Sequence, residues 1–95
     1  MVGYNIFKIL FEPMTEKDVA KGLDIPINEV RNSLNNLATS NLITHFIMNG
    51  DVYYIKKNIY DEVIKLVNNK YGNNINFTVE DYYRVIMSEI ININN

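Results

Sequence analysis

Residues 15–43 read TEKDVAKGLDIPINEVRNSLNNLATSNLI, and this stretch decides the fold. Its pattern predicts two helices joined by a short corner. Thr15 and Asp18 have the spacing of a capping box, in which the threonine hydroxyl accepts a hydrogen bond from the first turn of a helix. We expect this helix to run to about Leu23 and a second helix to occupy residues 27–39.

Each of these helices has one face for the core and one for solvent, because successive residues are about 100° apart. In the second helix, which has Pro26 at its first turn, Val30, Leu34 and Leu37 mark the buried face. The opposite side is polar and carries Asn28, Asn32, Asn35, Asn36 and Thr39, flanked by Glu29 and Arg31. On the preceding helix, Lys17 and Lys21 point outward.

The flanking segments predict one earlier helix and a β-hairpin. Tyr4–Phe11 is a short apolar helix that ends before Pro13, since proline disfavours helix in the residue before it. Residues 44–48 alternate like a strand, and residues 52–55 form the return strand. Asn49-Gly50 lies between them, and it is a strong hairpin signal because both central residues of the favoured turn need positive φ.

Two more helices are expected after the hairpin. Asn58 is a candidate cap for a helix over residues 59–71. Thr78 and Asp81 repeat the capping-box spacing and begin a last helix over residues 79–91. The expected fold is therefore mainly α with a β-hairpin, in the order helix, helix, helix, hairpin, helix, helix.

Composition limits the classes of function. A chain of 95 residues is one domain, and the absence of cysteine excludes a disulfide framework and a thiolate metal site. The single histidine, His45, argues against a histidine metal cluster, so we expect no metal and no cofactor. No apolar run approaches the roughly 20 residues of a membrane span, and the N-terminus lacks a signal-peptide pattern. We expect a cytoplasmic protein that makes no membrane contact.

Catalysis is not expected. The chain has no Gly-rich phosphate loop, no Ser/His/Asp set and no cysteine nucleophile. Its adjacent acids, Asp61-Glu62 and Glu80-Asp81, fall in the first turns of expected helices, where carboxylates interact favourably with the helix dipole.

The net charge of −2 counts against nucleic-acid binding, for which a basic surface is the usual footprint. The charge is unevenly distributed along the chain. Residues 1–57 hold six basic and six acidic side chains, so the acidic excess lies after residue 57.

The order of helices and hairpin resembles the winged helix-turn-helix family of transcriptional regulators, of the MarR/ArsR/PadR kind. The resemblance covers about residues 4–57. Two segments carry the resemblance. GLDIPINEVRNSLNNLATSNLI looks like the family's glycine corner, its recognition helix and the residues by which the chain leaves that helix. The hairpin ITHFIMNGDVYYI looks like the family's wing. The resemblance implies a winged helix-turn-helix domain over residues 1–57 and a C-terminal helical extension over residues 58–95, together one compact unit.

In this motif the second helix of the pair enters the major groove of double-stranded DNA. Asparagine can bond adenine N6 and N7, and arginine can bond guanine O6 and N7, so a face rich in asparagine suits an A/T-rich target. The expected base-reading residues are Asn28, Arg31, Asn32, Asn35 and Asn36. The expected phosphate contacts are Lys17, Lys21, Thr39, Lys56 and Lys57. The alternative is that the asparagines are solvated positions in an Asn-rich chain.

The hairpin tip departs from family members whose wing inserts a basic residue into the minor groove. The tip consists of Asn49, Gly50 and Asp51 and has no lysine or arginine. The Asp51 carboxylate repels phosphate. Because one chain offers few cations, DNA binding should require a dimer.

The last expected helix offers a surface for dimerisation. Its apolar and aromatic side chains form two adjacent stripes, which is more than one contact needs. The expected two-fold interface consists of Tyr82, Tyr83, Ile86, Met87, Ile90 and Ile91. The alternative is a five-helix monomer that buries both stripes by itself.

The expected function is a homodimeric transcriptional regulator that binds double-stranded DNA. Repression by promoter occupancy is the direction that the resemblance implies, and the richness in Asn and Ile fits an A/T-rich prokaryote, archaeon or one of their viruses. The competing hypothesis is a winged-helix module that binds protein and not DNA, which the negative charge and the acidic hairpin tip favour. Added salt separates the two, because it weakens DNA binding steeply and an apolar contact does not respond in that way.

Overall fold

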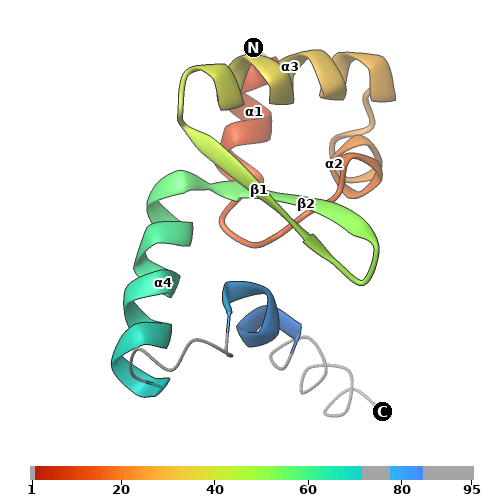
Figure 1. Cartoon of the computed structure of the whole chain (residues 1–95). Coiled ribbons are helices and arrows are strands. Elements are labelled where there is room, and N and C mark those ends of the chain that lie inside the picture. The colour runs from red at the N-terminus through yellow and green to blue at the C-terminus, as the bar shows by residue number, and fades with distance from the viewer. Residues whose placement is uncertain (1, 72–77, 85–95) are drawn as a thin grey trace. The chain divides into compact units, whose positions relative to one another are not determined.

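The computed structural model describes residues 2–71 and 78–84, and these are mainly helical with one two-stranded antiparallel hairpin (Figure 1). The elements follow in the order α1 (Val2–Ile9), α2 (Glu16–Leu23), α3 (Ile27–Thr39), β1 (Ile43–Met48), β2 (Asp51–Lys56) and α4 (Lys57–Tyr71). Residues 79–84 are also helical. The predicted combination of helices with a β-hairpin is confirmed. The chain forms two compact units, Met1–Tyr60 and Asp61–Asn95.

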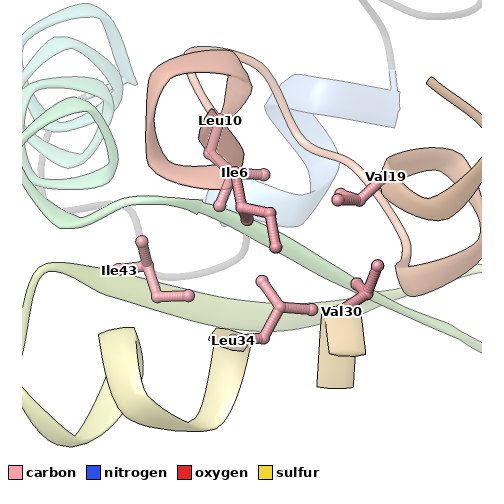
Figure 2. Close-up of a cluster of buried hydrophobic side chains, with 6 residues drawn as sticks. All are labelled: Ile6, Leu10, Val19, Val30, Leu34 and Ile43. Atoms are coloured by element: carbon pink, nitrogen blue, oxygen red, sulfur yellow. The ribbon is translucent and has the colours of Figure 1, made fainter. Parts of the chain in front are cut away.

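The core of the first unit lies between the three helices and the hairpin. Six buried side chains converge there, as Figure 2 shows: Ile6, Leu10, Val19, Val30, Leu34 and Ile43. They come from α1 and the residue after it, from α2, from α3 and from β1, so every element before β2 contributes. Full burial of one such side chain is worth about 1.5–3 kcal/mol. This core fixes which side of α3 faces outward.

The corner between α2 and α3 depends on Asp24. At the start of α2 the predicted capping box is present, since Thr15 Oγ1 accepts from the Asp18 N–H at 3.1 Å and Asp18 Oδ2 accepts from the Thr15 N–H at 3.0 Å. At its end, Asp24 has a left-handed backbone with φ 54° and donates its N–H to the Ala20 carbonyl. Gly22 lies inside α2, so the left-handed residue of this corner is Asp24 and not a glycine.

Both ends of α3 are defined by backbone hydrogen bonds. The Pro26 carbonyl accepts from the Glu29 N–H at 3.1 Å and from the Val30 N–H at 3.2 Å. Pro26 is therefore the cap residue just before α3, not a member of its first turn. At the other end, Asn41 is left-handed with φ 63°, and the chain turns there towards the hairpin.

The hairpin has the predicted two-residue turn. Asn49 and Gly50 have φ of 54° and 84°, as the favoured hairpin turn requires. In the register, Met48 pairs with Asp51 next to the turn. The sequence predicts that Leu42 and Ile43 both return to the core. Ile43 is buried as predicted, but Leu42 is 48% exposed.

α1 ends at Ile9, two residues earlier than predicted. The Leu10 carbonyl accepts the Lys56 N–H at 2.9 Å, so the chain leaves the helix to follow β2. Met14 then exchanges two backbone hydrogen bonds with Tyr54, at 3.0 and 2.7 Å. This bridge was not predicted, and it joins the hairpin to the segment between α1 and α2 by backbone hydrogen bonds.

α4 begins directly where β2 ends. It starts at Lys57, so Asn58 lies inside its first turn and is not its cap as predicted. The Lys57 N–H donates to the Leu42 carbonyl at 3.0 Å, which satisfies one of the first helical N–H groups. No helix among the described residues combines the length and apolar character that crossing a membrane requires.

In the second unit, the predicted capping box at Thr78 is present. The Asp81 N–H donates to Thr78 Oγ1 at 3.2 Å, and the Thr78 N–H donates to Asp81 Oδ2 at 3.0 Å. These backbone and side-chain hydrogen bonds from Thr78, assisted by Arg84, hold the pKa of Asp81 below its ordinary value. The helix that starts here is described over residues 79–84, and the rest of the predicted helix lies outside the described residues.

Candidate nucleic-acid interface

The outward face of α3 is a row of amide side chains. All four predicted base-reading asparagines are exposed: Asn28, Asn32, Asn35 and Asn36. Val30 and Leu34, on the opposite face, are 0% and 1% exposed. Within residues 2–71 and 78–84, none of the four amide side chains has a hydrogen-bond partner. Each amide holds a donor beside an acceptor, which is the combination that adenine N7 and N6 need.

Arg31 lies beside this row and is paired with a residue of α2. Its Nε donates to Glu16 Oε2 at 2.9 Å, and the two side chains are 56% and 27% exposed. The hydrogen bond to Glu16, followed by its negative charge, raises the pKa of Arg31 above its ordinary value. Among the described residues, the two terminal nitrogens of Arg31 have no hydrogen-bond partner. Arg31 is therefore exposed as predicted, but its orientation is set by an acid on the neighbouring helix.

Tyr54 of β2 completes a polar cluster with this pair. Burial raises the pKa of the Tyr54 phenol, the Glu16 charge raises it further, and the Arg31 charge lowers it. The Tyr54 ring packs against the hydrophobic core and lies 6.1 Å from the ring of His45 across the hairpin. Residues of α2, α3 and β2 thus meet beside the amide row.

Thr39 does not have the geometry of the predicted phosphate contact. Its Oγ1 donates to the Asn35 carbonyl at 2.8 Å. A threonine hydroxyl has one hydrogen, and phosphate oxygens need donors. In this rotamer Thr39 has no hydrogen left for a phosphate, because the backbone of its own helix takes it.

The four lysines predicted to contact phosphate fall into two pairs. Lys17 and Lys21 are exposed and lie one turn apart on α2. Lys56 is half-buried, with its Nζ 4.6 Å from the centre of the Phe7 ring, and Lys57 follows it at the start of α4. The second pair lies at the end of the hairpin opposite its tip.

A hollow of about 520 Å³ lies between the start of α2 and the hairpin tip. Its charged lining consists of three acids, Glu16, Asp18 and Asp51, and one base, Lys17. Glu16 is paired with Arg31, but Asp18 and Asp51 leave the hollow negative. A phosphate would be repelled there, which agrees with the predicted unsuitability of the hairpin tip for DNA.

Only two of the predicted dimer-interface residues fall within the described part of the chain. Tyr82 is half-buried, and Tyr83 is 8% exposed, with ring centres 5.6 Å apart. Burial raises the pKa of Tyr83 to about 12. Tyr83 therefore has little side-chain surface left for a second chain. Ile86, Met87, Ile90 and Ile91 lie outside the described residues.

Two members of the site were not predicted. The sequence pattern gave Glu16 no role, and it placed Tyr54 only in the return strand. Glu16 lies 15 positions before Arg31, so no local spacing pointed to the pair.

Within residues 2–71 and 78–84, no group of three or more His, Cys, Asp or Glu side chains is placed to hold a metal ion. Comparison with protein-family models and with curated proteins finds no match for this chain.

Proposed function

We propose that this chain is a winged helix-turn-helix protein that binds double-stranded DNA as a homodimer, with α3 in the major groove. The observation that carries the proposal is the amide row on α3. Its side chains are exposed and have no hydrogen-bond partner among the described residues, while the opposite face of the same helix is fixed in the core. A rigid helix that presents unpaired amides suits direct contact with base edges.

The surroundings of α3 support this role. The corner at Asp24 sets α2 beside α3, as in motifs where the first helix crosses the phosphate backbone and the second enters the groove. The Met14–Tyr54 bridge holds the hairpin against the helices, which gives the wing a fixed position. Regulation of transcription, by repression at a promoter, is the role that the family resemblance implies.

The homodimer follows from the small number of cations. Lys17, Lys21, Lys56 and Lys57 are the candidate phosphate ligands of one chain. Four contacts would make affinity fall about 10²-fold between about 50 and about 200 mM salt, and the eight contacts of a dimer about 10⁴-fold. Specific binding at ordinary salt therefore favours two chains on successive major grooves, about one helical turn apart.

A second candidate function is a winged-helix module that binds a basic protein segment. The hollow at the hairpin tip favours it, because its charged lining is mostly acidic. Val52 lines the hollow and is paired across the hairpin with Ile47, and the two side chains are 40% and 63% exposed. An acidic hollow beside an exposed apolar pair suits a peptide better than a phosphate backbone.

The proposal is tested by removing amides from α3 and, as a matched control, from another helix. The wild-type chain first selects duplexes from a random pool, and the affinity for a selected duplex is then measured by fluorescence anisotropy. The double variant Asn28→Ala, Asn32→Ala should lose discrimination between selected and random duplex, since each bidentate contact is worth about 1–3 kcal/mol.

The control is Asn68→Ala, Asn69→Ala, which removes two exposed amides from α4. It should bind the selected duplex like the wild type. If both double variants lose discrimination equally, or if neither loses it, α3 is not the helix that reads the bases. Failure of the wild type to bind any duplex at low salt would leave the protein-binding module as the better hypothesis.

A further inference from the structure

We propose that Glu16 is a positioning residue that orients Arg31 towards a guanine, so that the preferred DNA sites contain a G·C pair beside the A·T pairs read by the amide row. This inference rests on the proposed function, and it specifies the class of DNA sequence that the site takes.

The geometry of the Glu16–Arg31 pair carries the inference. Glu16 accepts from Arg31 Nε, the nitrogen nearest the backbone, at 2.9 Å. Among the described residues, the two terminal nitrogens make no hydrogen bond, and the Arg31 side chain remains 56% exposed. The terminal edge of a guanidinium offers two parallel N–H donors, and guanine offers O6 and N7 as two parallel acceptors. The carboxylate therefore holds one edge of Arg31 and leaves the edge that matches guanine.

Positioning by Glu16 also lowers the entropic cost of recognition. A free arginine side chain loses rotamer freedom when it binds a base, and this entropy loss weakens binding. Arg31 is already held in one orientation by an acid on a different helix. An arginine without such a partner would have to be ordered by the DNA itself.

The position of Arg31 on α3 places the guanine among adenines. Residues three and four apart on a helix are neighbours, with Cβ atoms about 5–6 Å apart. Arg31 is three residues after Asn28 and four residues before Asn35, and both amides are exposed. These two asparagines are separated by about 10.5 Å along the helix axis, which corresponds to about three base pairs. The expected half-site therefore has a G·C pair within about three base pairs of its A·T pairs.

The pair also separates sequence recognition from phosphate attraction. Because Glu16 balances the charge of Arg31, the two together contribute no net charge to the attraction of phosphates. A carboxylate in the first turn of α2, the helix expected to cross the backbone, further disfavours non-specific binding. Removing Glu16 should therefore weaken discrimination while leaving non-specific affinity unchanged or higher.

The test uses the full chain, a random duplex pool and three protein samples. Wild type should select duplexes that contain a G·C pair next to A·T pairs, and replacing that pair by A·T should weaken its binding about 5- to 150-fold. Glu16→Ala should bind random duplex at least as tightly as wild type, but the same replacement should change its affinity less than about 3-fold.

A charge-swapped variant, Glu16→Arg with Arg31→Glu, separates base reading by Arg31 from a purely structural role of the ion pair. It restores an ion pair between α2 and α3, and its melting temperature should return towards that of wild type. If the pair serves only to hold the helices together, this variant will also regain wild-type discrimination, and the inference is then wrong. We expect it to remain without preference for G·C.

The inference and the proposed function fail in different ways. No binding of wild type to the pool at low salt refutes the proposed function. Binding with selected sites that contain only A·T pairs refutes the role of Arg31 in reading guanine. Selection of G·C by both wild type and Glu16→Ala refutes the positioning role of Glu16 and leaves the proposed function in place.

Discussion

The corner between α2 and α3 holds a non-glycine residue in a left-handed conformation, and replacing it should stabilise the protein. Asp24 has φ 54° and ψ 51° at the C-terminal end of α2. Relief of the Cβ contact in this conformation favours glycine by about 1 kcal/mol. Removing an acid from a helix C-terminus adds about 0.3–1 kcal/mol. The greater freedom of glycine in the unfolded chain offsets about 0.5–1 kcal/mol of this gain.

Asp24→Gly should therefore raise the free energy of unfolding by about 0.3–1.5 kcal/mol, which corresponds to an increase of about 1–12 °C in melting temperature. Asp24→Val should lower the free energy of unfolding by about 1–2 kcal/mol, because a β-branched residue tolerates this conformation poorly. Thermal unfolding followed by far-ultraviolet circular dichroism measures both effects. Asp24 is exposed, so the added valine gains no burial that would hide the backbone effect.

Gly22→Ala is the matched control for this corner. Gly22 lies inside α2, and a Cβ added there would meet no heavy atom within 4 Å. Alanine should therefore stabilise the helix by about 0.5–1 kcal/mol. A destabilised Gly22→Ala, or an Asp24→Val as stable as Asp24→Gly, would show that the left-handed residue of the corner is not Asp24.

Three further perturbations test the core, the hairpin turn and a buried phenol. In urea titrations, Leu34→Ala should lower the free energy of unfolding by about 2.7–5 kcal/mol, because the Leu34 side chain is only 1% exposed. Leu42→Ala should change it by less than about 1 kcal/mol, because Leu42 is 48% exposed. Gly50→Ala should cost about 1–2 kcal/mol, since Gly50 has φ 84°; an unchanged stability would place the turn elsewhere. Tyr83 should ionise near pH 12 and not near 10.0 in an ultraviolet absorbance titration, and Tyr83→Phe should remove that step. Because the unfolded chain releases this proton first, the contribution of Tyr83 to stability is complete below pH 10.0 and is lost as the pH rises to about 12; a pH-independent stability across this range would contradict the raised pKa.

Features that a few neighbouring residues determine could be predicted from the sequence. The capping boxes at Thr15 and Thr78 need only a hydroxyl and a carboxylate three residues apart, and both are present. The Asn49-Gly50 turn needs two residues that tolerate positive φ, and the hairpin has the predicted position. The buried and exposed faces of α3 follow from helical periodicity and a single core on one side.

Features that depend on contacts distant in sequence were missed. α1 ends early because the Leu10 carbonyl bonds to β2, and α4 begins at Lys57, where the Lys57 N–H reaches the Leu42 carbonyl. The Met14–Tyr54 bridge has no local pattern, since a single paired residue shows no strand periodicity. The partnership of Arg31 with an acid on α2 likewise depends on how two helices pack. Sequence periodicity placed Arg31 on the surface but could not show what orients it.

The measurement that tests the central claim most directly is a titration of the purified chain against A/T-rich duplex DNA of random sequence at two salt concentrations, with its mass in solution recorded alongside. We expect a dimer whose affinity falls about 10⁴-fold between about 50 and about 200 mM salt. Absence of binding at the lower salt, or binding that salt leaves unchanged, would contradict the assignment of α3 as a DNA-reading helix.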